Sequence, residues 1–440
     1  MSAAIGTASG ERCLAAHYAH LKTSSRSFPP SLMQSISDRR PPLSPAQALP
    51  LLGVLGILVS LWSDILLPTL TAIQQDLHTS ATSVQQTVSL FFVANAFMCL
   101  WHGVISDAYG RRRPLRFVLV VLLLSSLLCL KVTRIEELWV LRTAQGLAAG
   151  IGTILCRAII RDMYSGADAQ KMIARTSIVQ CLGLTLVPML GGWLTFVWGW
   201  RAVFAFLSVV AVLMLIVYSR LLPETLPPIR RQPLRVGTLW RAYRIVMGSA
   251  WFMRLTVAHV CNWIAMFLYV AAAPQYVVHL LGRPATEIYL VYVPMVLGLI
   301  AGLVCLPPLL QRWGTQRTVR LAYLGFLVVN ILNVALALLV APGLIHLVPL
   351  GGYAFMVALS LPLLIGHALQ PFSENAGLAA SCQMLLQYTG MALVAGVLAP
   401  LLWSSFWLMA LGCAALTLAS AALLLWQGQA TRRANRLSVA

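Results

Sequence analysis

Residues 103–115 read Gly-Val-Ile-Ser-Asp-Ala-Tyr-Gly-Arg-Arg-Arg-Pro-Leu and separate two long apolar segments. Gly103 allows two helices to approach closely, and Gly110 allows a tight turn. Asp107 can pair with a nearby arginine or cap the N-terminus of a neighbouring helix. An ordinary basic loop would explain the arginines, but it would not explain the spacing of glycine, aspartate and glycine. The stretch therefore predicts a structured turn between two helices.

The segments on both sides of this turn are apolar enough to cross a membrane. The stretch from Leu115 to Leu130 carries a single charge, and the later stretch from Ala202 to Ser219 carries none. Of the 440 residues, 59% are hydrophobic and 10% are charged, whereas about a quarter of a soluble domain is charged. Helices of ~20 apolar residues cross a hydrocarbon core about 30 Å thick.

This pattern predicts an all-α membrane protein with twelve transmembrane helices. The expected spans are 49–70, 84–105, 115–132, 138–160, 173–197, 202–222, 251–273, 287–310, 319–340, 345–369, 377–401 and 403–426. The two halves echo each other weakly, because Gly110 and Arg113 in GVISDAYGRRR match Gly314 and Arg317 in PPLLQRWGTQR. We therefore expect two pseudo-symmetric six-helix bundles around a central cavity, as in transporter folds built from repeats.

The spans divide the chain into five segments. They are a disordered cytoplasmic tail (1–46), an N-terminal six-helix bundle (47–222), a central cytoplasmic loop (223–249), a C-terminal six-helix bundle (250–427) and a cytoplasmic tail (428–440). The first segment lacks the apolar core of a signal peptide. With the N-terminus inside, the outer gaps hold only Lys131, Arg134, Arg201 and Arg283. Because basic residues favour the inner side, both termini are predicted to be cytoplasmic.

The net charge of +19 comes mainly from the inner gaps, and no basic stripe with interleaved aromatic residues suggests nucleic-acid binding. The nine cysteines have neither disulfide nor metal-ligand spacing. No HExxH, GxSxG or P-loop motif is present, so we expect neither an enzyme nor a cofactor or metal site. The expected partners are the lipid bilayer and a small-molecule substrate. One chain carries both halves, so we expect a monomer.

The stretch 103–115 resembles the signature loop between helices two and three of the major facilitator superfamily. In that family the loop acts as a latch that differs between outward-open and inward-open states. The resemblance implies this role for Gly103, Asp107, Gly110, Arg111, Arg112 and Arg113. A second stretch, Arg142-Thr-Ala-Gln145-Gly146, is similar to the family's fourth-helix motif, whose arginine is linked to proton coupling in exporters.

Asp64 and Arg142 are the expected proton-coupling residues. A charged side chain within a membrane costs at least ~2.5–3.5 kcal/mol, so Arg142 should face a cavity and an anionic partner. Asp64 is the only acid within an apolar run of the N-terminal half. Burial and a nearby cation act in opposite directions on the pKa of a carboxyl group, so the balance can change as a cavity opens. The alternatives are an arginine that snorkels from a helix end and an aspartate at the outer aqueous face.

The fifth expected span carries Gly183, Pro188, Gly191 and Gly192 and resembles the antiporter motif of the superfamily. In that motif, glycines and a proline bend the helix at the seam between the two domains. Here Val187 stands where the motif has a glycine. Close helix packing through small residues explains the glycines equally well.

Four shorter features narrow the resemblance to the Bcr/CflA drug-resistance branch of the family. They are Asp64-Ile-Leu-Leu-Pro68 with Ile73-Gln-Gln-Asp76-Leu77, Arg157-Ala-Ile-Ile-Arg161-Asp162, Trp200-Arg201-Ala-Val-Phe204 and Leu222-Pro223-Glu224-Thr225-Leu226. The resemblance covers about 47–427 and is denser in the first half. It implies a drug:proton antiporter in the bacterial inner membrane.

Polar and large apolar residues within the spans are candidates for the substrate cavity. They are Asn95, Gln180, Asn262, Trp263, Met266, Tyr269 and Tyr292, and each could instead form a helix–helix contact. The expected function is proton-coupled efflux of small amphipathic compounds. The alternative is a proton-linked importer of a small nutrient or nucleoside-like solute, because spacing does not reveal direction. A receptor or scaffold would require a soluble domain, which the sequence does not suggest.

Overall fold

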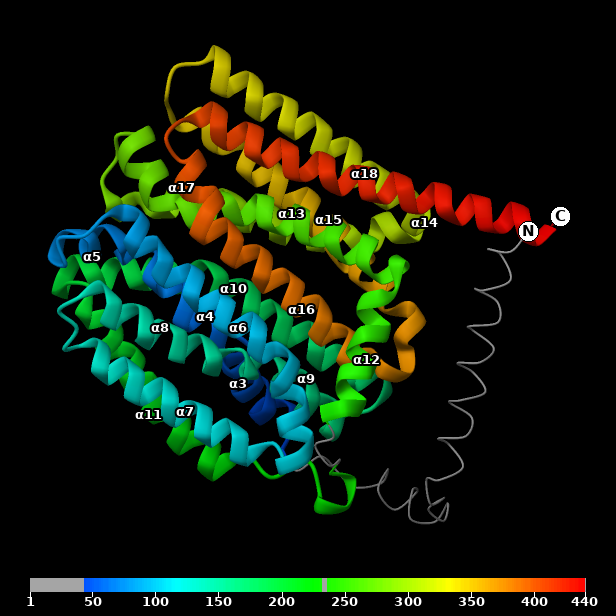
Figure 1. Cartoon of the computed structure of the whole chain (residues 1–440), viewed down its shortest axis with the longest axis horizontal. Coiled ribbons are helices and arrows are strands. Elements are labelled where there is room, and N and C mark those ends of the chain that lie inside the picture. The colour runs from blue at the N-terminus through cyan, green and yellow to red at the C-terminus, as the bar shows by residue number, and fades with distance from the viewer. Residues whose placement is uncertain (1–42, 232–235, 440) are drawn as a thin grey trace. The chain divides into compact units, whose positions relative to one another are not determined.

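The computed structural model describes residues 43–231 and 236–439, and the compact unit that begins at Pro45 is considered by itself here. Helices joined by short turns make up this unit, and the described residues contain no strand, which confirms the predicted all-α fold (Figure 1). The N-terminal half consists of α3 (Pro45–Gly56), α4 (Leu58–Ser63), η1 (Asp64–Thr69), α5 (Leu70–Asp76), α6 (Ala81–Tyr109), α7 (Arg112–Cys129), α8 (Ile135–Ala149), α9 (Ile151–Met163), α10 (Gly166–Trp198) and α11 (Arg201–Leu221).

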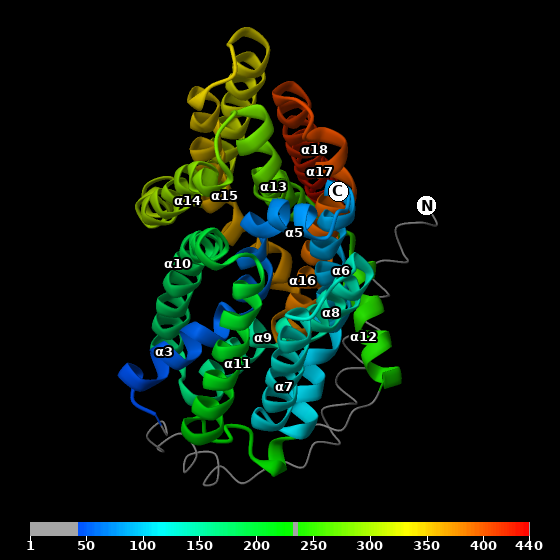
Figure 2. The same cartoon turned by 90° about the vertical axis from the view of Figure 1, so that its left-hand side faces the viewer.

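The second half follows a short connection made of η2 (Pro228–Arg230) and α12 (Val236–Gly248). The C-terminal half consists of α13 (Ala250–Gln275), η3 (Tyr276–Leu280), η4 (Ala285–Ile288), α14 (Tyr289–Leu339), η5 (Leu344–Leu347), α15 (Val348–Leu369), η6 (Gln370–Asn375), α16 (Ala376–Leu393), η7 (Val394–Leu398), α17 (Ala399–Leu402) and α18 (Phe406–Val439). Figure 2 shows the two halves from a second side.

Eight helical segments in the described residues are long and apolar enough to cross a membrane, and a bent pair at the start of the chain raises the number to nine. The pair is Ala46–Gly56 with Leu58–Asp76, bent by 43°. Two further helices differ from the rest: α7 carries three arginines in its first five residues, and only Leu186–Trp198 of α10 forms a separate apolar stretch. The number of spans predicted from the sequence is therefore matched only in part.

The weak echo between the two halves has a counterpart in the backbone. Gly110, which ends α6, has φ 87° and ψ 171°. Gly314, its match in the second half, has φ 68° and ψ 172° and is the non-helical residue inside α14. Both conformations lie in a region that favours glycine. The expected spans 287–310 and 319–340 therefore lie on the two sides of Gly314 within one element.

Three of the predicted segments contain helix where none was expected. The expected tail 1–46 falls almost wholly outside the described residues, and α3 begins within its last two residues at Pro45. The central segment 223–249 contains α12, whose Tyr243 donates a hydrogen bond to the Leu100 carbonyl of α6 at 2.5 Å. The expected C-terminal tail continues α18 as helix to Val439.

The helices run between two ends of the unit, which are named here by a residue at each. The Arg111 end contains the turns at 110–112, 163–166 and 222–231. The Asp76 end contains the turns at 77–81, 130–135, 198–201 and 403–405. The first span reaches the Asp76 end through α5, and α6 returns to the Arg111 end.

The two halves meet along a seam in which α6 packs beside α16 (Figure 1). Side chains of α6 donate hydrogen bonds to backbone carbonyls of the C-terminal half near the Asp76 end. The bonds run from Gln85 Nε2 to Ala271 O at 3.2 Å, from Gln86 Nε2 to Gly396 O at 2.9 Å and from Ser89 Oγ to Ala392 O at 2.9 Å. The halves are therefore in contact at this end.

Candidate functional site

Asp64 lies at the point where the first span changes from α-helix to 3₁₀-helix. Pro68 has no N–H to donate to the carbonyl of residue 64, so a regular α-helical bond is impossible there. The 3₁₀ stretch η1 accordingly begins at Asp64 and contains Pro68. The Asp64 side chain is 5% exposed, and its Oδ1 accepts a hydrogen bond from Ser63 Oγ at 2.6 Å. The helix break thus places a buried carboxyl group beside an irregular backbone.

Arg142 of α8 is fully buried and is held by the backbone of the first span. Its Nη1 donates to Trp62 O at 2.6 Å and to Gln145 Oε1 at 2.7 Å. The guanidinium also lies 4.5 Å from the ring centroid of Phe91, within the range of a cation–π contact. Its Nε and Nη2 atoms have no hydrogen-bond partner.

The predicted coupling residues are neighbours but not an ion pair. Among the ion pairs of residues 43–231 and 236–439, none joins Asp64 to Arg142, although the two side chains interact electrostatically. Arg142 is instead bonded two residues before Asp64, at Trp62 O. Two phenols of the C-terminal half, Tyr292 and Tyr388, also interact electrostatically with Asp64. The acid therefore faces groups from both halves.

Aromatic rings and an amide lie in the seam beside these residues. The ring of Phe92 stacks on Tyr388 at 5.9 Å and meets Phe267 edge-on at 5.5 Å. Asn95, one of the predicted cavity residues, is fully buried, and its amide forms no hydrogen bond of ordinary geometry. The hydroxyl of the predicted cavity residue Tyr292 is also buried without a partner. Such groups require water or a ligand to satisfy them.

The predicted cavity residues on α13 separate onto two faces of that helix. Asn262 donates to the Tyr323 hydroxyl at 2.9 Å, and Tyr269 accepts a bond from Asn333 at 2.7 Å. Met266 lines a cavity of about 10 Å³ together with Tyr269. These three predicted residues therefore point into the C-terminal half, where they join its helices to one another.

Trp263 occupies the other face of α13. Residues four apart share a helix face, and Phe267 and Ala271 of this face contact α6. The indole Nε1 of Trp263 is buried without a partner. Trp263 is thus the predicted α13 residue that the structure places on the seam.

The glycines predicted as a hinge in α10 pack against the first span of the same half. A side chain at Gly183 would meet Ile57 at 2.8 Å, and one at Gly191 would overlap the backbone carbonyl of Ile65. Gly192 leaves more room, with Pro68 3.6 Å from the position of a Cβ. These contacts are those of close helix packing within the N-terminal half, and the predicted hinge stays a prediction.

Two further predicted residues lie on α10. The Gln180 side chain packs over Gly56, also within the N-terminal half. Pro188 is buried inside α10. Because α10 also contacts α14, it lies between the first span and the C-terminal half.

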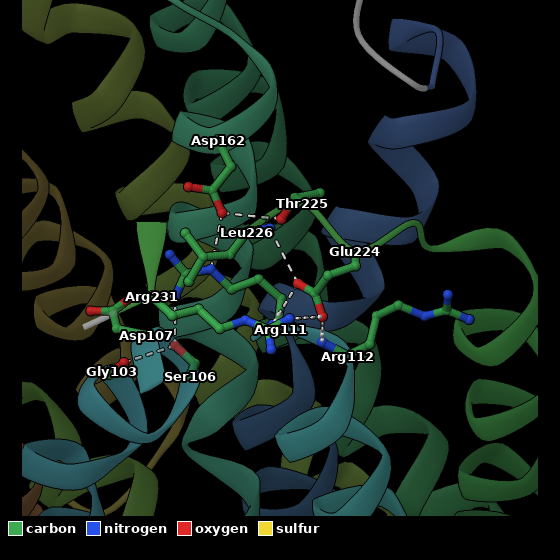
Figure 3. A network of polar contacts seen from close by, with 10 residues as sticks. All are labelled: Gly103, Ser106, Asp107, Arg111, Arg112, Asp162, Glu224, Thr225, Leu226 and Arg231. Carbon is green, nitrogen blue, oxygen red and sulfur yellow. Dashed lines mark hydrogen bonds and ion pairs between the residues drawn. The ribbon is translucent and has the colours of Figure 1, made fainter. Parts of the chain in front are cut away.

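Figure 3 shows one polar network centred on Arg111, which also contains three other predicted latch residues, Gly103, Asp107 and Arg112. The Arg111 side chain is 7% exposed. Its Nη1 donates to Asp107 Oδ1 at 2.5 Å and to Ser106 Oγ at 2.7 Å, and its Nε donates to Asp162 Oδ2 at 2.9 Å. Ser106 in turn donates to Gly103 O at 2.8 Å. One guanidinium thus joins the end of α6 to the end of α9.

Glu224 joins the network from the segment after α11. Its carboxylate accepts the backbone N–H groups of Arg111 at 2.8 Å and Arg112 at 3.3 Å, and Arg231 lies 3.9 Å away (Figure 3). These N–H groups belong to the first turn of α7, which favours a negative charge. A side chain at Gly110 would collide with Glu224, so a glycine is required there for this carboxylate as well as for its φ.

Asp162 and Glu224 were not among the residues predicted to form the latch, although both belong to stretches that carry the family resemblance. Thr225 donates to Asp162 at 3.0 Å, so these two stretches also contact each other. Arg112 reaches Ser219 O through its side chain, whereas Arg113 is exposed.

At the Asp76 end, a carboxylate likewise joins two stretches that are distant in the sequence. Asp76 accepts hydrogen bonds from Arg201 Nη1 at 2.7 Å and from Trp200 Nε1 at 3.2 Å. Trp200 and Arg201 begin α11, and Asp76 ends α5. Two more resemblance stretches are therefore joined by one carboxylate. No group of three His, Cys, Asp or Glu side chains suitable for a metal ion occurs in the described part of the chain.

Two halves of long apolar helices, with a buried acid and a buried arginine beside a broken first span, define a polytopic membrane protein of the transporter class. A family model described as Major Facilitator Superfamily matches residues 52–395. The chain belongs to this superfamily, as its motifs predicted.

Similar proteins include drug-resistance transporters, as the predicted resemblance to that branch requires. The chain is 32% identical over 228 residues to the uncharacterized MFS-type transporter YdgK of Bacillus subtilis, covering 51% of this chain and 56% of YdgK. It is 25% identical to the bicyclomycin resistance protein homolog of Haemophilus influenzae, over 54% of this chain and 59% of that protein. The chloramphenicol resistance protein CraA of Acinetobacter baumannii is 26% identical over 59% of this chain and 63% of CraA. The matches thus span less than two thirds of each relative.

Solved structures support the fold. A bacterial homolog of the human lysosomal transporter Spinster, in an inward-facing and unoccupied conformation, aligns with a TM-score of 0.66 at 14% identity, covering 87% of this chain and 96% of that chain. A mutant of the nucleoside transporter NupG aligns with a TM-score of 0.61 at 16% identity, covering 86% of this chain and 99% of that chain. At these identities the likeness concerns the fold alone.

Proposed function

We propose that this chain exports small amphipathic compounds across the bacterial inner membrane in exchange for protons. The observation that carries the proposal is Asp64, a buried acid without an ion pair among the described residues, placed at a helix break where groups from both halves face it. The names of the drug-resistance relatives favour export and favour drugs as substrates.

The proposal includes twelve spans in two six-helix bundles. Twelve spans result when the bent first pair counts as one, α14 is divided at Gly314, and α7 and α10 are included. Both termini then lie on the same side as the Arg111 end. The excess of arginine at that end favours a cytoplasmic location.

The proposed cycle alternates access to one site at the seam. Protonation of Asp64 from the outside releases the substrate outward. Deprotonation toward the cytoplasm frees the site for the next substrate. Arg142, bonded at Trp62 O, adjusts the electrostatic field at Asp64 without neutralising it by direct contact. One titratable acid predicts one proton per cycle, and a measured stoichiometry of two would contradict this mechanism.

The latch network would hold the Arg111 end in one of the two states. Arg111 joins the ends of α6 and α9, and Glu224 joins them to the segment that leads to α12. Because α12 is bonded to α6 through Tyr243, movement between the halves must strain or release these contacts.

The proposal is tested by accumulation of labelled antibiotics, dyes and nucleosides in pump-deficient bacteria that express the full chain. Each compound is measured with and without a protonophore, and beside Asp64→Asn. Asp168→Asn is the matched control, because Asp168 is exposed on α10 and its ion-pair partner among the described residues is the exposed Lys171. We expect lower accumulation that disappears with the protonophore or with Asp64→Asn and persists in Asp168→Asn. Raised accumulation would make the protein an importer, and export that survives the protonophore would exclude proton coupling.

A further inference from the structure

Arg157 is a second arginine within a candidate span, and its surroundings differ from those of Arg142. It lies on α9, six residues before the helix ends at Met163. Its side chain is exposed, whereas Leu155, Ile159 and Ile160 on the other faces of α9 are fully buried. An arginine within a span normally faces a water-filled cavity or a partner, so a function is the default expectation.

No acid in the described ranges forms an ion pair with Arg157. The acid closest in sequence, Asp162, accepts the guanidinium of Arg111 instead. Across the seam, Arg157 interacts electrostatically with Tyr388 of α16, and Tyr388 also interacts with Asp64. Tyr388 therefore lies within electrostatic reach of both Arg157 and the proposed coupling acid.

Arg142 and Arg157 differ in how accessible their guanidinium groups are to a ligand. Arg142 is fully buried, and its Nη1 is taken by Trp62 O and Gln145. Arg157 is exposed and so can meet a ligand. Tyr388, whose ring stacks on Phe92, lies within electrostatic reach of Arg157, and the ring pair offers an aromatic surface. A cation next to an aromatic surface suits a planar, apolar molecule that carries a negative charge.

We propose that Arg157 binds the anionic group of the transported compound, so that the site favours amphipathic molecules in which a carboxylate or sulfonate is attached to an aromatic body. This inference rests on the proposed function, because it specifies the substrate class of the same site. Export of an anion in exchange for a proton moves positive charge inward in both steps. The membrane potential would therefore assist such a cycle.

The test uses two dyes that share one ring system and differ by a sulfonate. They are 8-anilino-1-naphthalenesulfonate and its neutral parent N-phenyl-1-naphthylamine. Binding to the purified full chain in phosphatidylcholine nanodiscs is measured by equilibrium dialysis against empty nanodiscs. These discs contain no lipid with a net negative charge, so the membrane surface does not attract Arg157 electrostatically. The variants are Arg157→Gln, Arg157→Lys and, as a matched control one turn along α9, the exposed Arg161→Gln.

We expect Arg157→Gln to weaken binding of the sulfonate at least tenfold and to change binding of the neutral dye less than twofold. Arg157→Lys should recover part of the sulfonate affinity, because the charge is retained. Arg161→Gln should leave both affinities within twofold. Unchanged binding of the neutral dye also shows that each variant is folded. Equal loss for both dyes, or no loss for the sulfonate, would overturn the proposal, as would a wild-type protein that does not bind the sulfonate.

A transport measurement separates this inference from the proposed function. In proteoliposomes, an inside-negative potential should accelerate sulfonate export by the wild type and should have a weaker effect on the neutral dye. If the sulfonate binds through Arg157 but its transport does not depend on the proton gradient, the proposal of proton-coupled export is wrong and the proposed binding site is retained. If proton-coupled export of the neutral dye persists while Arg157→Gln leaves sulfonate affinity unchanged, the binding site is wrong and the export stands.

Discussion

Asp64 and Arg142 lie beside each other in the interior, yet Arg142 donates its hydrogen bonds to Trp62 O and Gln145 and forms no ion pair with the acid within the described residues. A direct ion pair would fix the charge of the acid. The observed arrangement leaves the carboxyl group with a bond from Ser63 and the opportunity to gain or lose a proton.

This relationship predicts that Asp64→Asn preserves stability while it abolishes coupling. Removal of one partner from a buried ion pair costs about 3–5 kcal/mol, but here no such pair exists to be broken. We expect the melting temperature of the purified variant, followed by tryptophan fluorescence, to equal or exceed that of the wild type. A large fall in melting temperature, with Asp168→Asn unchanged, would mean that the carboxylate is a structural partner of Arg142 after all.

Two adjacent glycines of α10 should respond differently to the same substitution. A methyl group at Gly191 would overlap the Ile65 carbonyl, whereas one at Gly192 would lie 3.6 Å from Pro68. Overpacking at a tight helix contact costs about 1–3 kcal/mol. We expect Gly191→Ala to lower the melting temperature and the yield of folded protein, and Gly192→Ala to behave like the wild type. Similar behaviour of the two variants would show that α10 can move away from η1 at little cost.

Within the latch network, the more buried acid should matter more for stability. The Asp162 side chain is 17% exposed and that of Asp107 is 47% exposed, although both bind Arg111. Exposed ion pairs contribute about 0–1 kcal/mol, whereas loss of a buried partner leaves a charge without compensation. Asp162→Asn should therefore lower the melting temperature more than Asp107→Asn does. The opposite order would assign Asp107 a structural role that its exposure does not suggest.

The seam near the Asp76 end should have to open during transport. Ser89 Oγ and Ala392 O are 2.9 Å apart, so cysteines at these two positions are close enough for a short bifunctional thiol reagent. Cross-linking of Ser89→Cys/Ala392→Cys should stop substrate movement in proteoliposomes, and a reductant should restore it. The wild type, whose described cysteines are free, and each single variant serve as controls for the reagent. Undiminished transport by the cross-linked protein would exclude opening at this seam.

The helices and several functional residues could be predicted from the sequence because their signals are local. Apolar runs, the Gly103–Asp107–Gly110 spacing and the charged residues Asp64 and Arg142 are visible within short windows. The partners of Arg111 are not, because Asp162 and Glu224 lie 51 and 113 residues away along the chain. The resemblance stretches contained both acids, but nothing in a single sequence shows that the stretches touch.

The predicted cavity residues on α13 illustrate a second limit of prediction from the sequence. Helical spacing places Asn262, Met266 and Tyr269 on one face and Trp263 about a quarter of a turn away. In a soluble protein the polar face would be the solvent face, but α13 is apolar or buried on nearly all sides. The sequence therefore contains no contrast that tells the seam from the interior of the half. Only the three-dimensional structure, through the hydrogen bonds to Tyr323 and Asn333, shows that this face points into the C-terminal half.

The hydrogen bonds of the seam also affect how freely the amino-acid sequence of each half can change during evolution. Gln85, Gln86 and Ser89 of α6 supply the donors through their side chains, whereas the C-terminal half supplies only backbone carbonyls to these three bonds. Every amino acid carries such a carbonyl, so a mutation at Ala271 or Ala392 keeps the acceptor, while a mutation on α6 removes the donor. Selection that maintains these bonds therefore acts on the chemical identity of the three α6 side chains, whereas it acts on Ala271 and Ala392 only through the buried space that they occupy. Gly396 of η7 is constrained more strictly, because a side chain there would meet Ser89 Oγ at 2.5 Å and displace the donor.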